Sequence, residues 1–129
     1  MMRKTLEARY YTSPEIYRLE SERIFRRNWL CMGRVAEIEQ PGKFITREVD
    51  GDNIVVLRDH EGELRGFHNV CRHRGSRVCV ESCGTVGRSI RCPYHGWTYS
   101  TGGDLLATAN MAEGLDAVDY SLAKVAVEQ

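Results

Sequence analysis

The sequence has 129 residues, which is enough for one domain with a modest hydrophobic core. Its 18 Lys and Arg side chains balance 18 Asp and Glu side chains, so no general electrostatic attraction draws it to nucleic acid or to a membrane surface. No apolar run is long enough to span a bilayer, and no apolar segment follows Arg3 and Lys4, so we expect no membrane anchor, no signal peptide and a cytoplasmic location.

The first predicted element is a helix from Ser13 to about Asn28. Ser13 is a favourable N-cap residue, Pro14 suits the first helical position, and Glu15 complements the positive end of the helix dipole. The apolar residues that follow have rough helical spacing. Nothing in this segment suggests chemistry, so we expect it to brace the surface of the protein.

Short β-strands are expected after this helix. The predicted strands span residues 29–35, 44–49, 54–58, 64–70, 89–91, 97–99 and 122–127. Turn residues separate them, mostly with glycine, at 41–42, 50–53, 60–63 and 101–104. Short strands at this spacing predict an all-β fold, an antiparallel sandwich or barrel with an N-terminal helix. We expect residues 1–40 to hold the helical lead-in and first strand, and residues 41–129 to form the main domain within one structural unit.

The five cysteines are not expected to form disulfides in a reducing cytosol. Cys31 lies in the apolar run Trp29-Leu30-Cys31-Met32 and is predicted to be a small buried residue. For Cys79 and Cys83, a structural or solvent-facing thiol is favoured over a metal ligand.

Two short segments pair a cysteine with a histidine: Cys71-Arg72-His73 and Cys92-Pro93-Tyr94-His95, with 18 residues between His73 and Cys92. Two cysteines and two histidines can hold a [2Fe–2S] cluster in which two thiolates bind one iron and two imidazoles bind the other, the ligand set of a Rieske centre. Both segments follow predicted strands, so we expect two cluster-binding loops on a rigid β scaffold.

Two other interpretations apply to the same residues. The first is that these are two buried cysteines and two ordinary histidines. That would suffice for a single Cys-His pair, but two such pairs, each closely followed by a glycine (Gly75 or Gly96), make coincidence a poor explanation. Structural zinc also uses two cysteines and two histidines, but such sites usually begin with two cysteines separated by two to four residues. The first pair here mixes the two residue types, so zinc is the runner-up metal.

The segments Asn69–Gly75 and Cys92–Tyr99 resemble the Rieske loops of the α subunits of Rieske non-haem iron oxygenases, which include ring-hydroxylating dioxygenases, monooxygenases and demethylases. The lead-in from Tyr11 is also similar to those subunits, and the resemblance covers roughly residues 10 to 127. It implies that residues 41–129 are a Rieske domain. It also implies a Rieske-type [2Fe–2S] cofactor bound by the following residues: Cys71, His73, Cys92 and His95.

The sequence departs from that family in one respect. In the family, a catalytic domain follows and binds a mononuclear iron through two histidines and one carboxylate. Beyond His73 and His95 this sequence has only His60, in a predicted turn, and His68, on a predicted strand. We therefore expect the Rieske domain of an oxygenase α subunit, excised or truncated, which belongs to an oxidoreductase but transfers one electron without hydroxylating a substrate by itself.

The resemblance also implies partners. A ferredoxin or flavoprotein reductase would donate the electron, a catalytic non-haem iron domain of a neighbouring subunit would accept it, and full-length family members are oligomeric. Five arginines near the two loops are candidates to face an acidic partner: Arg72, Arg74, Arg77, Arg88 and Arg91. The alternative, supported by length alone, is a free-standing Rieske-type ferredoxin. Aromatic hydrocarbon catabolism is one expected context, and quaternary ammonium oxidation is the other.

Three positions predict a low reduction potential. High-potential Rieske proteins of respiratory complexes have a cysteine in each loop that forms a disulfide, and a serine that donates to a cluster sulfide. Ser76, Tyr94 and Trp97 occupy the corresponding positions here, which favours the low end of the Rieske range, roughly −150 mV. Trp97 is expected to shield the cluster from water. Tyr99 is either a donor to a cysteine sulfur or a core aromatic residue.

Overall fold

The computed structural model describes residues 4–109 and 116–129. It divides into two compact units, one up to Cys31 and one from Met32 onward. Within the described ranges, no helix combines the length and the apolar character needed to cross a lipid bilayer.

The first unit is helical. Helix α1 spans Arg9–Thr12, helix α2 spans Pro14–Glu20, and a π-helical turn, η1, continues over Ser21–Phe25. As predicted, Ser13 caps α2, because its Oγ accepts a hydrogen bond from the Ile16 N–H at 3.4 Å. The short helix α1 was not predicted from the sequence.

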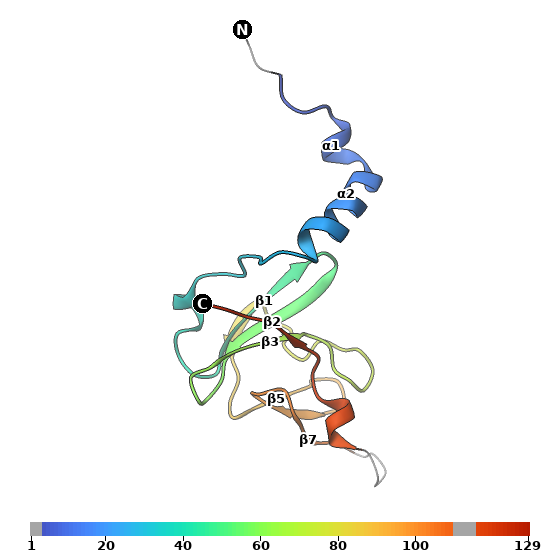
Figure 1. Ribbon diagram of the computed structural model, residues 1–129. Helices are drawn as coiled ribbons and strands as arrows, with labels where there is room; N and C mark the ends of the chain where they lie inside the picture. The colour runs from blue at the N-terminus through green and yellow to red at the C-terminus, as the bar shows by residue number, and fades with distance from the viewer. Residues whose placement is uncertain (1–3, 110–115) are drawn as a thin grey trace. The chain divides into compact units, whose positions relative to one another are not determined.

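The second unit contains two antiparallel sheets, both visible in Figure 1. The larger sheet has the strand order β4-β1-β2-β3-β8, and the smaller one has the order β5-β6-β7. The strands are β1 Lys43–Val49, β2 Asp52–Arg58, β3 Leu64–His68, β4 Cys83–Thr85, β5 Ser89–Arg91, β6 Thr98–Ser100, β7 Leu105–Ala107 and β8 Lys124–Val125. Two 3₁₀ turns, η2 Val35–Ile38 and η3 Ala117–Tyr120, complete the described part of this unit. The predicted all-β antiparallel fold with an N-terminal helix is confirmed.

The predicted strand over residues 29–35 is wrong. Residues 29–34 have no regular secondary structure, and Val35 begins the 3₁₀ turn η2. Cys31, predicted to be buried, is exposed, and the neighbouring Trp29 is 66% exposed. Among the described residues, 29–34 pair with no strand of either sheet, so the apolar run has no ladder to join.

Strand β4 was missed because three residues with no alternation of apolar side chains carry no signal of their own. Its strand character comes from pairing with β1, where Lys43 lies opposite Thr85. The predicted last strand over residues 122–127 reduces to β8, whose two residues pair with β3. In both cases the partner strand, rather than local propensity, decides the conformation.

The hairpin between β1 and β2 sets the register of the larger sheet. Asp50 and Gly51 both have positive φ, 51° and 85°, as a two-residue type I′ turn requires. Val49 then pairs with Asp52, and the alternation along β2 sends Val55 to one face of the sheet and Ile54 to the other. The hairpin turn predicted at residues 50–53 is present at Asp50 and Gly51, whereas Asp52 and Asn53 already belong to β2.

Both faces of the larger sheet are covered, and the core has two parts. A small cluster holds Ile38, Ile45, Ile54 and Val56. The main cluster joins side chains of both sheets: Phe44, Val55, Leu57, Phe67, Cys71, Val78, Cys79, Ile90, Cys92, Trp97, Tyr99, Leu105 and Leu122. The cysteines of both predicted loops therefore lie in the main core, which anchors the loops from within.

Candidate metal centre

Two loops of nearly identical backbone geometry carry the four predicted ligands. The first loop, residues 71–76, follows β3, and the second loop, residues 92–97, joins β5 to β6. In the first, the Cys71 N–H donates to the carbonyl oxygen five residues on, Ser76, at 2.7 Å. In the second, the Cys92 N–H donates to Trp97, again five residues on, at 2.8 Å. Each loop thus holds its cysteine at the base of one closed turn.

The match extends to the glycines that follow the histidines. The N–H groups of Gly75 and Gly96 donate to the carbonyl oxygens of Cys71 and Cys92, both at 3.0 Å. Their φ angles are 73° and 74°, in the left-handed region that L side chains disfavour. Glycine at these two positions therefore allows the tight turn of each loop.

The two thiols lie inside the protein and close together. Cys71 and Cys92 are each 2% exposed. Burial is the main cause that raises the pKa of the Cys71 thiol, the hydrogen bond with Tyr99 opposes it, and the neighbouring Cys92 adds to the increase. A positive ion between these sulfurs would reverse that balance, because a coordinating thiol loses its proton.

The two imidazoles lie nearer the surface than the thiols. His73 and His95 are both half-buried, and their ring centroids are 4.7 Å apart. Burial, and then the charges of His95 and Arg74, lower the pKa of His73. This favours the neutral imidazole, the form that binds a metal.

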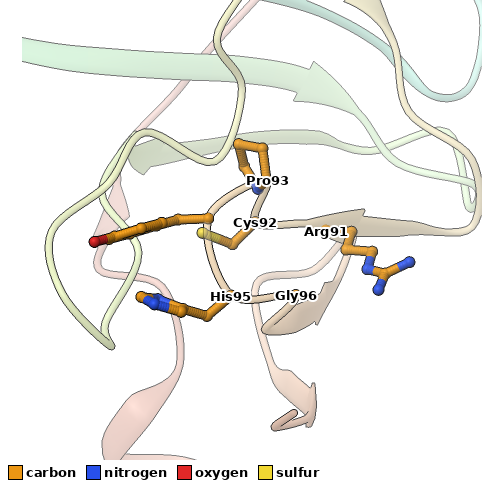
Figure 2. A pocket seen from close by; sticks show the side chains of 6 residues that line it. Arg91, Cys92, Pro93, His95 and Gly96 are labelled. Carbon is orange, nitrogen blue, oxygen red and sulfur yellow. The ribbon is translucent and has the colours of Figure 1, made fainter.

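The second loop directs its two predicted ligands to one side. Figure 2 shows the Cys92 sulfur and the His95 ring on the same side of the loop, whereas the Arg91 side chain extends the other way. These residues line a pocket together with Pro93, Tyr94 and Gly96. The ring of Tyr94, 61% exposed, lies 3.8 Å from the His95 ring between centroids.

Two buried aromatic residues pack against the site. The Tyr99 hydroxyl lies 3.3 Å from the Cys71 Sγ and accepts a hydrogen bond from the Arg72 N–H at 3.1 Å. Tyr99 is 0% exposed, so it is a core aromatic residue, and its hydroxyl also lies within hydrogen-bond distance of a cysteine sulfur, where either atom can be the donor. The Trp97 ring stacks on His73, with 5.0 Å between centroids and 8° between planes, and it is also fully buried.

This donor set, two thiols and two imidazoles, fits a binuclear cluster. Across residues 4–109 and 116–129, no three His, Cys, Asp or Glu side chains gather around one ion position. A Rieske cluster needs only two protein ligands on each iron. Within the same ranges, the Trp97 indole nitrogen is the only buried side-chain nitrogen or oxygen without a hydrogen-bond partner.

The remaining candidates lie elsewhere. His60 Nε2 lies 2.8 Å from the Gly87 carbonyl oxygen, and His68 ends β3, as expected from the sequence. Cys83 is exposed on β4, whereas Cys79 is buried and burial raises its pKa to about 11, which keeps it a neutral thiol. The expectation that Cys79 and Cys83 are structural or solvent-facing agrees with these positions.

Sequence analysis missed one residue at this site, Asn69. It is fully buried and its amide makes four hydrogen bonds to three residues: Asn53, Val78 and Cys79. A signal was available, because residues 67 and 69 would share one face of the predicted strand over residues 64–70, and Phe67 is a core residue. A polar side chain at such a position must find partners inside the protein.

Comparison with protein families identifies the domain. Residues 28–125 match the family described as the Rieske [2Fe-2S] domain. The chain therefore belongs to the Rieske [2Fe–2S] family, whose domain holds a Rieske-type cluster.

Similar proteins are oxygenase subunits. The oxygenase subunit of glycine betaine monooxygenase from Chromohalobacter salexigens is 41% identical over 119 residues, which cover 92% of this chain and 26% of that protein. The α subunit of benzene 1,2-dioxygenase from Pseudomonas putida is 38% identical over 126 residues, which cover 95% of this chain and 28% of that protein. The chain thus spans little more than a quarter of the length of these relatives.

Solved structures agree with this fold. The quaternary ammonium Rieske monooxygenase CntA, in complex with L-carnitine, superposes with a TM-score of 0.88 at 37% identity, over 96% of this chain and 36% of that one. Naphthalene 1,2-dioxygenase from Rhodococcus sp. gives a TM-score of 0.83, also at 37% identity, over 93% of this chain and 28% of that one. The chain is thus similar in sequence and in fold to the Rieske domains of oxygenase subunits.

Proposed function

We propose that this chain carries single electrons through a [2Fe–2S] cluster as the electron-entry domain of a Rieske oxygenase. The proposed ligands are Cys71 and Cys92 for one iron, and His73 and His95 for the other. The observation that carries the proposal is the pair of matched loops, which bring two buried thiols and two half-buried imidazoles together. When bound, such a cluster supplies a one-electron couple whose potential lies above that of an all-cysteine cluster.

The surroundings of the two thiols support this role. Cys71 and Cys92 lie in the main core, where water is excluded and where the protein changes shape little when one electron is added. Tyr99 offers a hydrogen bond to the Cys71 sulfur, and Trp97 covers His73 with its ring. Both contacts limit the access of water to the proposed cluster position.

The low potential inferred from the sequence remains part of the proposal. Ser76 and Tyr94 cannot form a disulfide between the two loops, and Trp97 brings an indole where a serine hydroxyl would donate to a sulfide. Tyr99 keeps one donor to a cysteine sulfur. One retained donor and one lost donor favour a value near the low end of the Rieske range, roughly −150 mV.

The imidazole side is the proposed face for electron exchange. His73 and His95 are the most exposed of the four proposed ligands, and Arg72 and Arg74 are exposed beside them. We propose a ferredoxin or flavoprotein reductase as donor, and the catalytic iron domain of a neighbouring subunit as acceptor. Inter-subunit electron transfer is a property of one related protein, a quaternary ammonium Rieske monooxygenase.

The substrate preference of the whole protein is proposed to lie outside residues 28–125. Relatives named for glycine betaine and for benzene match this chain at 41% and 38% identity, almost equally. A domain that moves only electrons has no contact with the substrate and is free to be shared between both classes. We therefore propose a Rieske oxygenase without assigning it to aromatic hydrocarbon catabolism.

Metal analysis with electron paramagnetic resonance tests the proposal. The purified chain should contain equal amounts of iron and acid-labile sulfide, and reduction with dithionite should produce a Rieske-type signal. Replacing any one of the four proposed ligands by alanine should abolish that signal. His60→Ala and His68→Ala are the matched controls and should keep it. A colourless protein that contains zinc and no sulfide would overturn the proposal.

A further inference from the structure

The two matched loops differ in what closes them from outside. The second loop joins β5 to β6, and these strands pair with each other up to Arg91 and Thr98, directly beside the loop. The first loop follows β3, which pairs with β2 and β8 and not with the segment that leaves the loop. Both loops are closed by their own backbone hydrogen bonds, but only the segments that flank the second loop are also joined by sheet hydrogen bonds. Other contacts must join the segments that flank the first loop.

The side-chain amide of Asn69 lies at the place where the missing sheet bonds would be. Its Oδ1 accepts hydrogen bonds from the N–H groups of Val78 and Cys79, at 3.1 and 2.9 Å. Its Nδ2 donates to the Cys79 carbonyl oxygen and to the Asn53 Oδ1, both at 2.6 Å. These four bonds use every donor and acceptor of the amide, and the donors and acceptors around it determine which way it points.

The main chain at the same residue is also anchored. The Asn69 N–H donates to the Asn53 carbonyl oxygen at 2.8 Å, which ties the entry to the first loop to β2. Cys71 lies two residues further on. The side chain then ties the exit of the loop, at Val78 and Cys79, to the same residue. One buried asparagine thus joins both ends of the loop to the larger sheet.

A chain of polar contacts also leads from this amide to the surface, but these contacts contribute less than the four buried bonds of Asn69. The Asn53 Nδ2 donates to the Glu48 Oε1 at 2.8 Å, and Arg77 pairs with the same oxygen at 2.5 Å. The side chains of Glu48 and Arg77 are 55% and 53% exposed. Exposed ion pairs contribute little, whereas a buried polar group that loses its partner is costly. Asn69, which is 0% exposed, therefore contributes more than the exposed ion pair to joining the two ends of the first loop.

We infer that Asn69 is the positioning residue of the first loop, which sets where Cys71 and His73 stand relative to Cys92 and His95. This inference rests on the proposed function in that these residues hold a cluster. Asn69 does not contact the cluster in this role. It acts by fixing the loop that carries two of the four ligands, and its loss loosens that loop while the second loop stays closed.

Amide hydrogen exchange on the metal-free chain tests the loop first. In Asn69→Leu, which keeps the branched shape of the side chain and removes every amide bond, the Val78 and Cys79 N–H groups should exchange about tenfold faster. The Cys92 and Gly96 N–H groups of the second loop should stay unchanged and serve as an internal control. Equal acceleration in both loops, or none in either, would overturn the inference.

The cluster-loaded chain tests the consequence for the ligands. The Asn69→Leu variant should lose the visible colour of its cluster about tenfold faster than the wild type in the presence of an iron chelator. The g values of its reduced cluster should also differ from those of the wild type. Two controls separate this from general destabilisation. Val56→Ala removes methyl groups from the small core cluster on the other sheet face, and Glu48→Ala breaks only the exposed end of the chain of polar contacts.

Both controls should keep the wild-type g values and bleaching rate, even if Val56→Ala unfolds at a lower temperature. If Asn69→Leu behaves like Val56→Ala in both measurements, the inference is wrong. If the wild-type chain binds no iron or sulfide, the proposed function fails by itself. The exchange comparison then still decides whether Asn69 closes the first loop.

Discussion

Tyr99 and Cys71, 28 residues apart in the sequence, meet at the inner side of the proposed centre, with 3.3 Å between the hydroxyl oxygen and Sγ. The same hydroxyl accepts the Arg72 N–H, so its own proton is directed toward the sulfur. Burial and the bond to Cys71 raise the pKa of Tyr99, which keeps the hydroxyl protonated. The Tyr99 hydroxyl is therefore the hydrogen-bond donor in this contact whenever Cys71 is a thiolate.

Tyr99→Phe should lower the reduction potential. A donor to the sulfur stabilises the more negative, reduced state, so its removal favours the oxidised state. A hydrogen bond worth about 1 kcal/mol corresponds to about 40 mV for one electron. Protein-film voltammetry measures the change. Tyr120→Phe is the control, since Tyr120 contacts the edge of Trp97 rather than a cysteine, and it should leave the potential in place. An unchanged potential in Tyr99→Phe would contradict the assignment.

The glycines of the two loops offer a matched pair of substitutions. Gly75→Ala should cost about 1–2 kcal/mol of unfolding free energy, because its φ is positive while a new Cβ meets no atom within 4 Å. Gly96→Ala has the same backbone cost, and its Cβ would also lie 3.3 Å from the Arg91 Nη2. Urea unfolding should therefore find Gly96→Ala the less stable of the two.

Adding Arg91→Ala should remove that difference and leave the backbone cost common to both loops. A Gly75→Ala variant as stable as the wild type would show that the left-handed turn is not required.

Trp97→Ala should destabilise the protein by about 3–5 kcal/mol, the usual cost of emptying the site of a buried tryptophan. The residue is fully buried, and its ring stacks on His73. Trp97→Phe keeps an aromatic ring there and removes an N–H that has no hydrogen-bond partner within the described residues. It should therefore retain most of the stability. Thermal unfolding of the metal-free chain measures the stability of Trp97→Ala and Trp97→Phe. An equal drop in unfolding temperature in both variants would contradict a packing role for the ring.

Asp59 should make stability depend on pH. Burial opposes its ionisation, but the hydrogen bond from Arg65 and those from the N–H groups of Glu63 and Glu61 outweigh it, so the pKa of Asp59 lies below its usual value. A lowered folded-state pKa gives stability that is present above the unfolded pKa, about 3.9, and is lost as the pH falls through the folded pKa.

Asp59→Asn should therefore have a lower free energy of unfolding than the wild type at pH 7, and this difference should become smaller in acid. Urea unfolding of the metal-free chain at pH 7 and at about pH 3 measures it. Glu61→Gln, whose side chain is 83% exposed, is the control and should change little at either pH. A gap that stays constant between the two pH values would contradict the role of the Asp59 charge.

Residue types and local turn chemistry determined much of this protein. Cys71, His73, Cys92 and His95 are the proposed ligands because of their residue types, their spacing and the resemblance to Rieske loops. Asp50-Gly51 predicted a hairpin turn, and the structure has the positive φ angles that such a turn requires. Ser13 and Pro14 marked the start of α2. Each of these signals lies within a few residues of what it specifies, because helix caps, tight turns and loop motifs depend on neighbouring residues.

Only the tertiary structure decided which distant residues meet. Residues 29–32 have an apolar sequence that predicted a strand, but residues 29–34 pair with no strand in the described part of either sheet. Asn69 can join the two ends of the first loop because the fold brings Asn53 and Cys79 within hydrogen-bond distance of its amide. Edge pairing and buried amide bonds depend on long-range register, which the packing of two sheets sets and no local pattern encodes.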